Sequence, residues 1–335
     1  MNKKVIYDLV VLGYPKSYLP IFNELEGKDN IYLIPPFWKN QKELFHFLLR
    51  MDLAYKKQIR SRETGEYLGS NPLFEKSTIS ADSSICYLFF RDWYPLFASG
   101  YIRKIKELAP NTKTCWFFSD LVDTYPGIDI ERMQNEFDLI LSFDPEDAER
   151  YGFVYCPLSY SALPEAKIWQ NQERRSNVFF MGHAKKRLDM IIAVYERLRN
   201  EGLDCDFHIV GVPLQEQRYP DEIHYGNFLP YIDYLQMALS SRCILEILQD
   251  PTHHGFTART SEALVYGRKL LSNNIGLISA PFYDQRQINV FSGPAEINID
   301  FITNEWQPAS SPELFSPQHI LKLIEERFAV KLLTT

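Results

Sequence analysis

Short apolar runs alternate with amphipathic segments along the whole chain. Runs rich in β-branched and aromatic residues between turn residues predict buried strands, and apolar positions at helical spacing predict helices. The predicted strands cover residues 5–13, 30–35, 84–90, 114–118, 137–143 and 155–158 in the first half, and 177–181, 206–210, 223–225, 242–248 and 269–272 in the second. Because strands alternate with helices in both halves, the fold class is α/β, with two Rossmann-like, doubly wound parallel sheets.

The predicted helices lie between these strands. They cover residues 41–62, 102–108, 145–151, 186–201, 230–239, 261–266 and 317–328. Residues 164–176 are polar and lack strand character, which is typical of a connection between domains. We therefore expect an N-terminal domain over 1–168 and a C-terminal domain over 169–335, with the last helix as a candidate to pack back on the first domain.

Length and composition narrow the class of protein. A chain of 335 residues suggests two domains, and 45% hydrophobic residues suffice for two large cores. The 36 basic and 43 acidic residues give a net charge of −7, which argues against a nucleic acid partner held by a general basic field. The five cysteines form no CxxC motif or Cys/His cluster, so neither zinc nor a disulfide scaffold is expected. With no apolar run of 18 residues and no cleavage site after the first apolar run, we expect a cytoplasmic protein.

Residues 254–273 hold the most informative chemistry, because a loop and a helix start follow the predicted strand 242–248. Thr257 or Thr260 is placed to cap the helix, whose N-terminus would offer N–H groups and a positive dipole to a phosphate. Arg259 can add a bidentate contact to that phosphate, and Glu262 can accept from ribose hydroxyls. The alternative is that Arg259 is only a solvated surface residue and that Glu262 only favours the helix start.

This stretch resembles the donor-binding domain of GT-B fold glycosyltransferases. Gly255 and Phe256 match the start of the family's pattern, and the remaining matches are Glu262, Ala263, Gly267 and residues 269–271. Residues 223–240 and the segment 178–187, with its glycine and basic residues, resemble upstream parts of the same domain, so the resemblance spans about 177–274. It implies two Rossmann-like domains that face each other across a cleft. The N-terminal domain, 1–168, would then be the acceptor side, and the C-terminal domain, 169–335, would bind the nucleotide-sugar.

The resemblance also implies roles for single residues. Glu262 would bind the ribose of the nucleotide, and Gly182 would let its loop approach the donor. Either Lys186 or Arg187 would contact the diphosphate, which Thr257 and the nearby backbone would also hold.

One position departs from the family's pattern. His254 stands where retaining members usually have a glutamate, so it becomes a catalytic candidate itself, and retaining or inverting stereochemistry stays open. Adjacent histidines such as His253 and His254 point apart in a strand, and no third ligand is evident, so we expect no metal there. No cofactor is expected, since the nucleotide-sugar donor is a substrate.

An inverting enzyme needs a base for the acceptor hydroxyl, and three aspartates follow predicted strands in the first half: Asp92, Asp120 and Asp144. An aspartate after a strand is more often the cap of the next helix. Asp144 best fits such a cap, because proline and two acidic residues follow it. Asp120 is the preferred catalytic candidate, and Gly13 with Tyr14 would lie at the mouth of the cleft.

These observations favour a metal-independent glycosyltransferase of the hexosyltransferase class. As the resemblance implies, it would move a sugar from a nucleotide-sugar to a glycan or lipid-linked acceptor in surface polysaccharide synthesis. The alternatives are a nucleotide-sugar 2-epimerase of the same fold and a non-catalytic nucleotide-sugar-binding subunit. The histidine at 254 in place of an acid favours the non-catalytic subunit. The basic stretch 45–62 predicts a solvated helix face, or contact with the inner face of an anionic membrane. The oligomeric state is open.

Overall fold

The structure is a computed structural model, and it describes residues 6–12, 22–34, 43, 84–125, 127–170, 175–249, 255–305 and 313–332. Predictions for Gly13 and Tyr14, for most of the helix 41–62, and for His253 and His254 lie outside these residues. The chain divides into two compact units. The first comprises Met1–Lys16, Glu24–Cys156 and Gln318–Thr335, and the second comprises Ser17–Asn23 and Pro157–Pro317. The main passage between the units falls at Cys156 and Pro157, and the chain returns to the first unit for its last helix.

The first unit is built on a parallel sheet of six strands in the order β2-β1-β3-β4-β5-β6. The strands are β1 (Asp8–Leu12), β2 (Ile31–Ile34), β3 (Ile85–Phe89), β4 (Lys113–Phe118), β5 (Leu139–Ser142) and β6 (Val154–Tyr155). The central strands are buried on both faces, which explains why their sequences are continuous apolar runs. Winding reverses between β1 and β3, so this sheet's ligand-binding edge lies at the carboxyl ends of those two strands.

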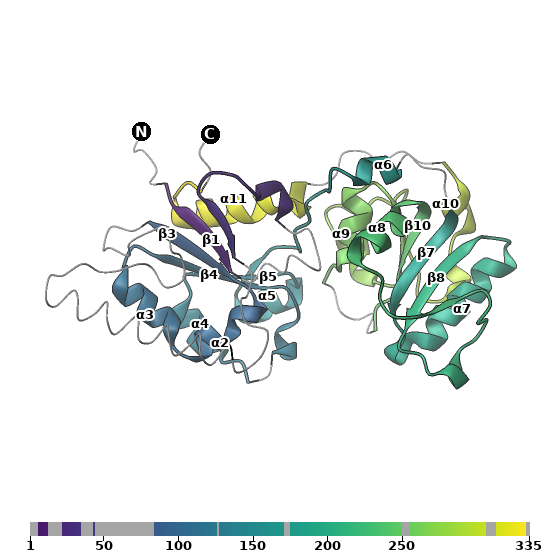
Figure 1. The fold of residues 1–335 in the computed structure, drawn as a ribbon, viewed down its shortest axis with the longest axis horizontal. Coiled ribbons are helices and arrows are strands. Elements are labelled where there is room, and N and C mark those ends of the chain that lie inside the picture. The colour runs from purple at the N-terminus through teal and green to yellow at the C-terminus, as the bar shows by residue number, and fades with distance from the viewer. Residues whose placement is uncertain are drawn as a thin grey trace, which may run out of the picture. The chain divides into compact units, whose positions relative to one another are not determined.

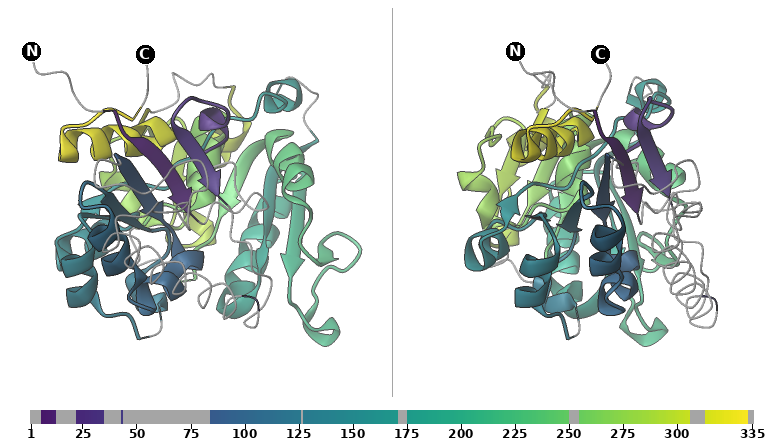
Figure 2. Two further views of the ribbon diagram at one scale, coloured as in Figure 1. Left: turned by 60° about the vertical axis from the view of Figure 1, so that its left-hand side comes forward. Right: turned by 90° about the vertical axis from the view of Figure 1, so that its left-hand side faces the viewer.

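Helices cover both faces of this sheet (Figures 1 and 2). They are α2 (Tyr94–Ala98), α3 (Tyr101–Leu108), α4 (Ile130–Glu136) and α5 (Pro145–Tyr151), with α11 (Pro317–Phe328) on the side opposite α2, α3 and α4. The core beneath α2–α4 is aromatic, and Trp116 makes ring contacts with Phe118, Tyr125 and Phe137. Much of the aromatic content of the chain is therefore used for packing.

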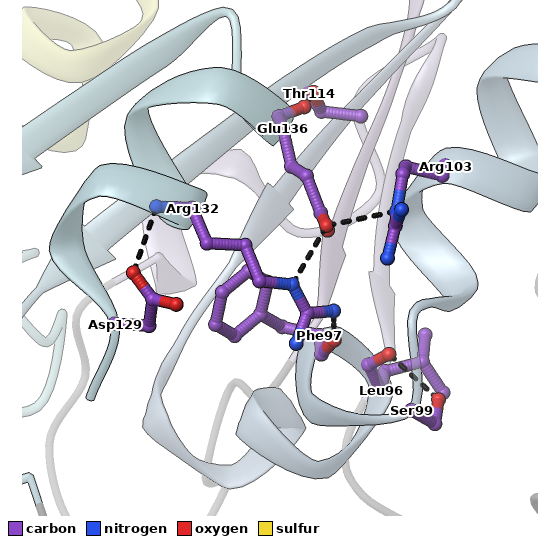
Figure 3. A network of polar contacts seen from close by, with 8 residues as sticks. All are labelled: Leu96, Phe97, Ser99, Arg103, Thr114, Asp129, Arg132 and Glu136. Atoms are coloured by element: carbon purple, nitrogen blue, oxygen red, sulfur yellow. Dashed lines mark hydrogen bonds and ion pairs between the residues drawn. The ribbon is translucent and has the colours of Figure 1, made fainter. Parts of the chain in front are cut away.

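A buried carboxylate joins α2, α3 and α4 (Figure 3). Glu136 is 5% exposed, and its Oε1 accepts from Arg132 Nε at 2.8 Å and from Arg103 Nε at 3.0 Å. Arg132 also donates to the carbonyl of Phe97 at 2.6 Å and lies over that ring. Because Arg132 is the more buried of the two arginines, it supplies most of the charge that Glu136 requires.

The second unit has a parallel sheet in the order β12-β11-β10-β7-β8-β9, which is the Rossmann order with its reversal between β7 and β10. The strands are β7 (Ser176–His183), β8 (Cys205–Val210), β9 (His224–Gly226), β10 (Ser241–Glu246), β11 (Lys269–Ser272) and β12 (Ile288–Val290). The helices are α6 (Ala166–Gln170), α7 (Leu188–Asn200), α8 (Tyr231–Leu239), α9 (Ala258–Val265) and α10 (Ile299–Thr303). Helices α7 and α10 pack on one face, and α8 and α9 on the other (Figure 1). The predicted α/β class with two Rossmann-like sheets is confirmed.

Candidate functional site

The candidate site lies where β7 and β10 end, at the point of reversed winding that binds ligands in open α/β sheets. β7 ends in Gly182 and His183 and leads into a short turn of helix, Lys185–Arg187. A Cβ built at Gly182 would lie 3.0 Å from Arg187 Nη2 and 3.3 Å from Arg259 Nη2. Glycine therefore lets two guanidinium groups approach the end of the strand together.

Main-chain carbonyls hold both arginines in place. Arg187 donates through Nε to the carbonyl of His183 at 2.9 Å, and through Nη1 to the carbonyl of Ile247. Arg259 donates through Nη2 to the carbonyl of Met181. The two cations are thus fixed by groups at the ends of β7 and β10, and no carboxylate makes an ion pair with either of them in the described part of the chain.

The electrostatics of the pair favour an anion. Burial, and after it the charge of the nearby Arg259, lower the pKa of Arg187 to about 10, while Glu246 opposes the shift. Arg187 therefore stays charged at neutral pH beside a second cation. A bound anion would relieve the repulsion between the two charges. Arginine guanidinium groups hold phosphate oxygens in bidentate geometry.

Glu246 is a buried carboxylate that the sequence reasoning missed. It ends β10 and is 1% exposed, and its oxygens accept from the hydroxyls of Thr257, Thr260 and Ser272. These bonds fix the start of α9 against the ends of β10 and β11. A single acidic residue inside the apolar run 242–248 was the available signal, because a charge there must be paired or hydrogen-bonded.

Helix α9 begins as predicted at a threonine cap, since Thr257 Oγ1 accepts from the backbone N–H of Arg259 at 3.1 Å. Glu262 lies in the second turn of α9 rather than the first, and it is 1% exposed. Tyr234 donates to its Oε2 at 2.5 Å, and Tyr231 donates to its Oε1 at 3.2 Å. The sequence reasoning missed both tyrosines, which α8 contributes.

The protonation of Glu262 follows from this environment. Burial raises the pKa of Glu262 to about 7, against the opposing effects of the Tyr234 hydroxyl and the Arg259 charge. The charge of Arg259 thus acts on this carboxyl, whose pKa lies near neutral pH. The pKa of Tyr234 is raised strongly, first by burial and then by the charge of Glu262, so the phenol remains a donor.

Other residues predicted for this site differ in exposure. Phe256 is 5% exposed and packs edge-on against Phe282, so its side chain belongs to the core. Lys186 is exposed and lines a groove of about 590 Å³ together with Asp189, Arg218 and other residues after β7 and β8. Gly255 is buried, and its carbonyl accepts from Asn274.

The three aspartates of the first unit lie in different settings. Asp144 caps α5 as expected, because its Oδ1 accepts from the Asp147 N–H at 2.9 Å. Asp120 pairs with Arg91 at 2.9 Å, and both side chains are about half exposed, at 48% and 47%. Asp92 follows β3 at the reversal of winding, and the residue as a whole is exposed. Partial desolvation raises the pKa of its carboxyl, and the charge of Arg91 opposes this shift. Asp92 is thus the better placed base candidate.

Comparison of the fold places both units in a known class. A sucrose-phosphate synthase from Thermosynechococcus elongatus is similar to this chain with a TM-score of 0.51 and 10% identity, over 96% of this chain and 99% of that one. A putative UDP-N-acetylglucosamine 2-epimerase from Listeria monocytogenes gives a TM-score of 0.45 at 10% identity, over 98% and 100% of the two chains. The likeness to the synthase shows a shared fold of two Rossmann-like α/β units, which is the fold that the GT-B resemblance implies.

Comparison of the sequence identifies the second unit further. Residues 187–300 match the model of a family described as glycosyl transferase-like, and no curated protein matches the chain. This part of the chain is thus similar to a glycosyl transferase-like domain, and the resemblance to glycosyltransferases is confirmed. Among the described residues, no helix combines the length and apolar character needed to cross a membrane.

Proposed function

We propose that the protein is a glycosyltransferase that uses a nucleotide-sugar donor and a glycan or lipid-linked acceptor. The observation that carries this proposal is the pair of guanidinium groups, Arg187 and Arg259, gathered around Gly182 at the winding reversal. Two fixed cations beside a helix N-terminus suit a nucleoside diphosphate. Neither an anchored metal nor a cofactor is required to neutralise that diphosphate.

Glu262 is the proposed partner of the ribose. Its Tyr231 bond is long, at 3.2 Å, so a ribose hydroxyl can replace the Tyr231 hydroxyl while Tyr234 keeps the carboxylate oriented. Lys186 is exposed beside the same turn and is a further candidate for the diphosphate. The backbone at 255–257 leads into the start of α9 and is a further candidate to hold the diphosphate.

In the proposed reaction the bond between the sugar C1 and the diphosphate oxygen breaks, and the acceptor oxygen forms the new bond to C1. The developing charge on the diphosphate is met by Arg187 and Arg259, which are oriented before the reaction and need no reorganisation. The acceptor hydroxyl passes its proton to a carboxylate of the first unit, for which Asp92 is the best candidate. The resemblance favours surface polysaccharide synthesis as the setting of this reaction.

Calorimetric titration with nucleoside diphosphates and their sugar conjugates tests this assignment. We expect Arg259→Ala and Glu262→Ala each to weaken donor binding by roughly 1–3 kcal/mol, the loss typical of charged hydrogen bonds. Arg286→Ala is the matched control, because Arg286 pairs with Asp284 on the exposed surface of the same unit. Equal affinity of folded Arg259→Ala and wild type would reject the site.

Product analysis separates transfer from epimerisation. Donor incubated without acceptor should keep its configuration, and diphosphate release should require acceptor. Formation of the 2-epimer without acceptor would instead assign an epimerase, and binding without either reaction would assign a non-catalytic subunit.

A further inference from the structure

Two histidines and an aspartate meet on the face of the second sheet that α8 covers. Asp206 and His208 are two residues apart on β8, so their side chains share one face, and His224 lies directly opposite His208 on β9. The ligand atoms of the three side chains all lie within 4.8 Å of one another. The cluster is separate from the donor site, since it lies along β8 and β9 rather than at the ends of β7 and β10.

The contacts of the cluster leave it accessible from solvent. His208 Nε2 lies 2.8 Å from Asp206 Oδ1, and these side chains are 16% and 20% exposed. The His208 and His224 rings stack with centroids 4.6 Å apart. His224 is exposed, and within the described residues its ring nitrogens have no hydrogen-bond partner.

We propose that Asp206, His208 and His224 form a binding site for a divalent transition metal of the zinc class. Imidazole nitrogen and carboxylate oxygen are typical ligands of zinc, at about 2.0–2.2 Å. Tetrahedral ligands at that distance lie about 3.3–3.6 Å apart, so a rotation of the exposed His224 side chain out of the ring stack completes the set. A water takes the fourth position. Magnesium and calcium, which prefer oxygen ligands, do not suit two imidazoles.

The ion would tie an edge strand to its sheet. β9 has three residues and pairs only with β8 among the described strands, so little else in the sheet holds it. A ligand from each strand clamps the directly paired residues His208 and His224. The first effect of the metal is therefore on the stability of the second unit.

The cluster also borders the proposed ribose site through aromatic rings. Phe179 packs against His208 on one side and against Tyr234 on the other, with centroids 5.8 Å and 5.6 Å away. Tyr234 in turn holds Glu262. The zinc-site proposal does not depend on the proposed function, because none of its three ligands is a donor-binding residue.

The test is a titration of untagged, full-length protein, stripped with a chelator, with zinc alone against a chromophoric competitor. We expect one zinc per chain, at least tenfold weaker binding in Asp206→Asn and His224→Ala, and unchanged binding in His319→Gln, which removes a histidine from the first unit. Zinc should raise the melting temperature of wild type and leave that of His224→Ala unchanged. Magnesium should change neither melting temperature.

X-ray absorption at the zinc edge supplies a second measurement, in which two imidazole ligands are expected. Failure of wild type to bind zinc at micromolar concentration, or undiminished binding by folded His224→Ala, would overturn the proposal. His224→Gln gives the same comparison if the alanine variant fails to fold. Donor affinity measured with a chelator present should equal that of the untreated protein. Failure of the zinc proposal would therefore not affect the glycosyltransferase assignment, which the donor titration tests separately.

Discussion

Replacement of Glu262 by glutamine should change the pH dependence of folding in a way that only a buried acid can produce. Glu262 is 1% exposed, and burial raises its pKa from 4.5 to about 7. Below pH 4.5 the carboxyl is protonated in folded and unfolded chains alike and contributes no pH dependence. Between 4.5 and 7 the folded protein keeps a proton that the unfolded chain has released, so stability falls as pH rises.

The size of the effect follows from the shift. A difference of about 2.5 pH units at 1.36 kcal/mol each corresponds to about 3 kcal/mol, fully present above pH 7. The glutamine of Glu262→Gln is isosteric and uncharged, so it avoids this cost. Relative to wild type, the variant should therefore gain about 3 kcal/mol between pH 4 and pH 8.

The assay is urea unfolding of wild type and Glu262→Gln at several pH values, monitored by circular dichroism. If the two units unfold in separate transitions, the transition of the second unit is the one compared. Titrations shared by both proteins cancel in the difference. Glu149→Gln, which removes an exposed carboxylate from the first unit, controls for the loss of one negative charge. A difference between wild type and Glu262→Gln that stays constant within about 0.5 kcal/mol from pH 4 to pH 8 would refute the reasoning.

Three further predictions concern single contacts. Gly182→Ala places a Cβ 3.0–3.3 Å from the two guanidinium groups of the candidate site, so donor affinity measured by calorimetry should fall about tenfold or more. Tyr234→Phe removes a 2.5 Å bond to the buried carboxylate and should cost about 1.5–3 kcal/mol at pH 8 but clearly less at pH 5, where that group is protonated. Arg132→Ala should destabilise the first unit by about 2–4 kcal/mol in urea, whereas Arg103→Ala, from a side chain 67% exposed, should cost under about 1 kcal/mol; equal losses would contradict the assigned burial.

The sequence predicted the strands of the two sheets better than the helices that pack on them. The predicted strands 114–118 and 206–210 agree with β4 and β8 to within one residue at their ends. β4 is almost continuously apolar because it is buried on both faces, whereas Asp206 and His208 lie on a partly exposed face of β8. The short helices α2 and α10 went unpredicted, since five residues carry too little periodicity. The polar connection 164–176 contains α6, which packs on α8, a contact that local pattern does not encode.

The candidate site was predictable where chemistry is local and unpredictable where it depends on topology. Gly182, Arg187 and Arg259 were identified, and the structure brings these residues together. Tyr231 and Tyr234 were missed because α8 reaches Glu262 only across the folded sheet. Asp120 pairs with Arg91, and Asp92 follows β3 next to the reversal of winding, which depends on strand order and not on local pattern. The choice of base between them stays a prediction.

The return of the chain to the first unit through α11 has a consequence for biosynthesis. Most of the second unit is the single segment Pro157–Pro317, and its other segment, Ser17–Asn23, is made earlier, so this unit can fold as it leaves the ribosome. The first unit must wait for its last helix, and the Tyr7 N–H then finds the carbonyl of Lys331 at 2.8 Å. A nascent chain halted before Pro317 would therefore present a finished C-terminal half and an N-terminal half whose sheet still exposes apolar surface to chaperones.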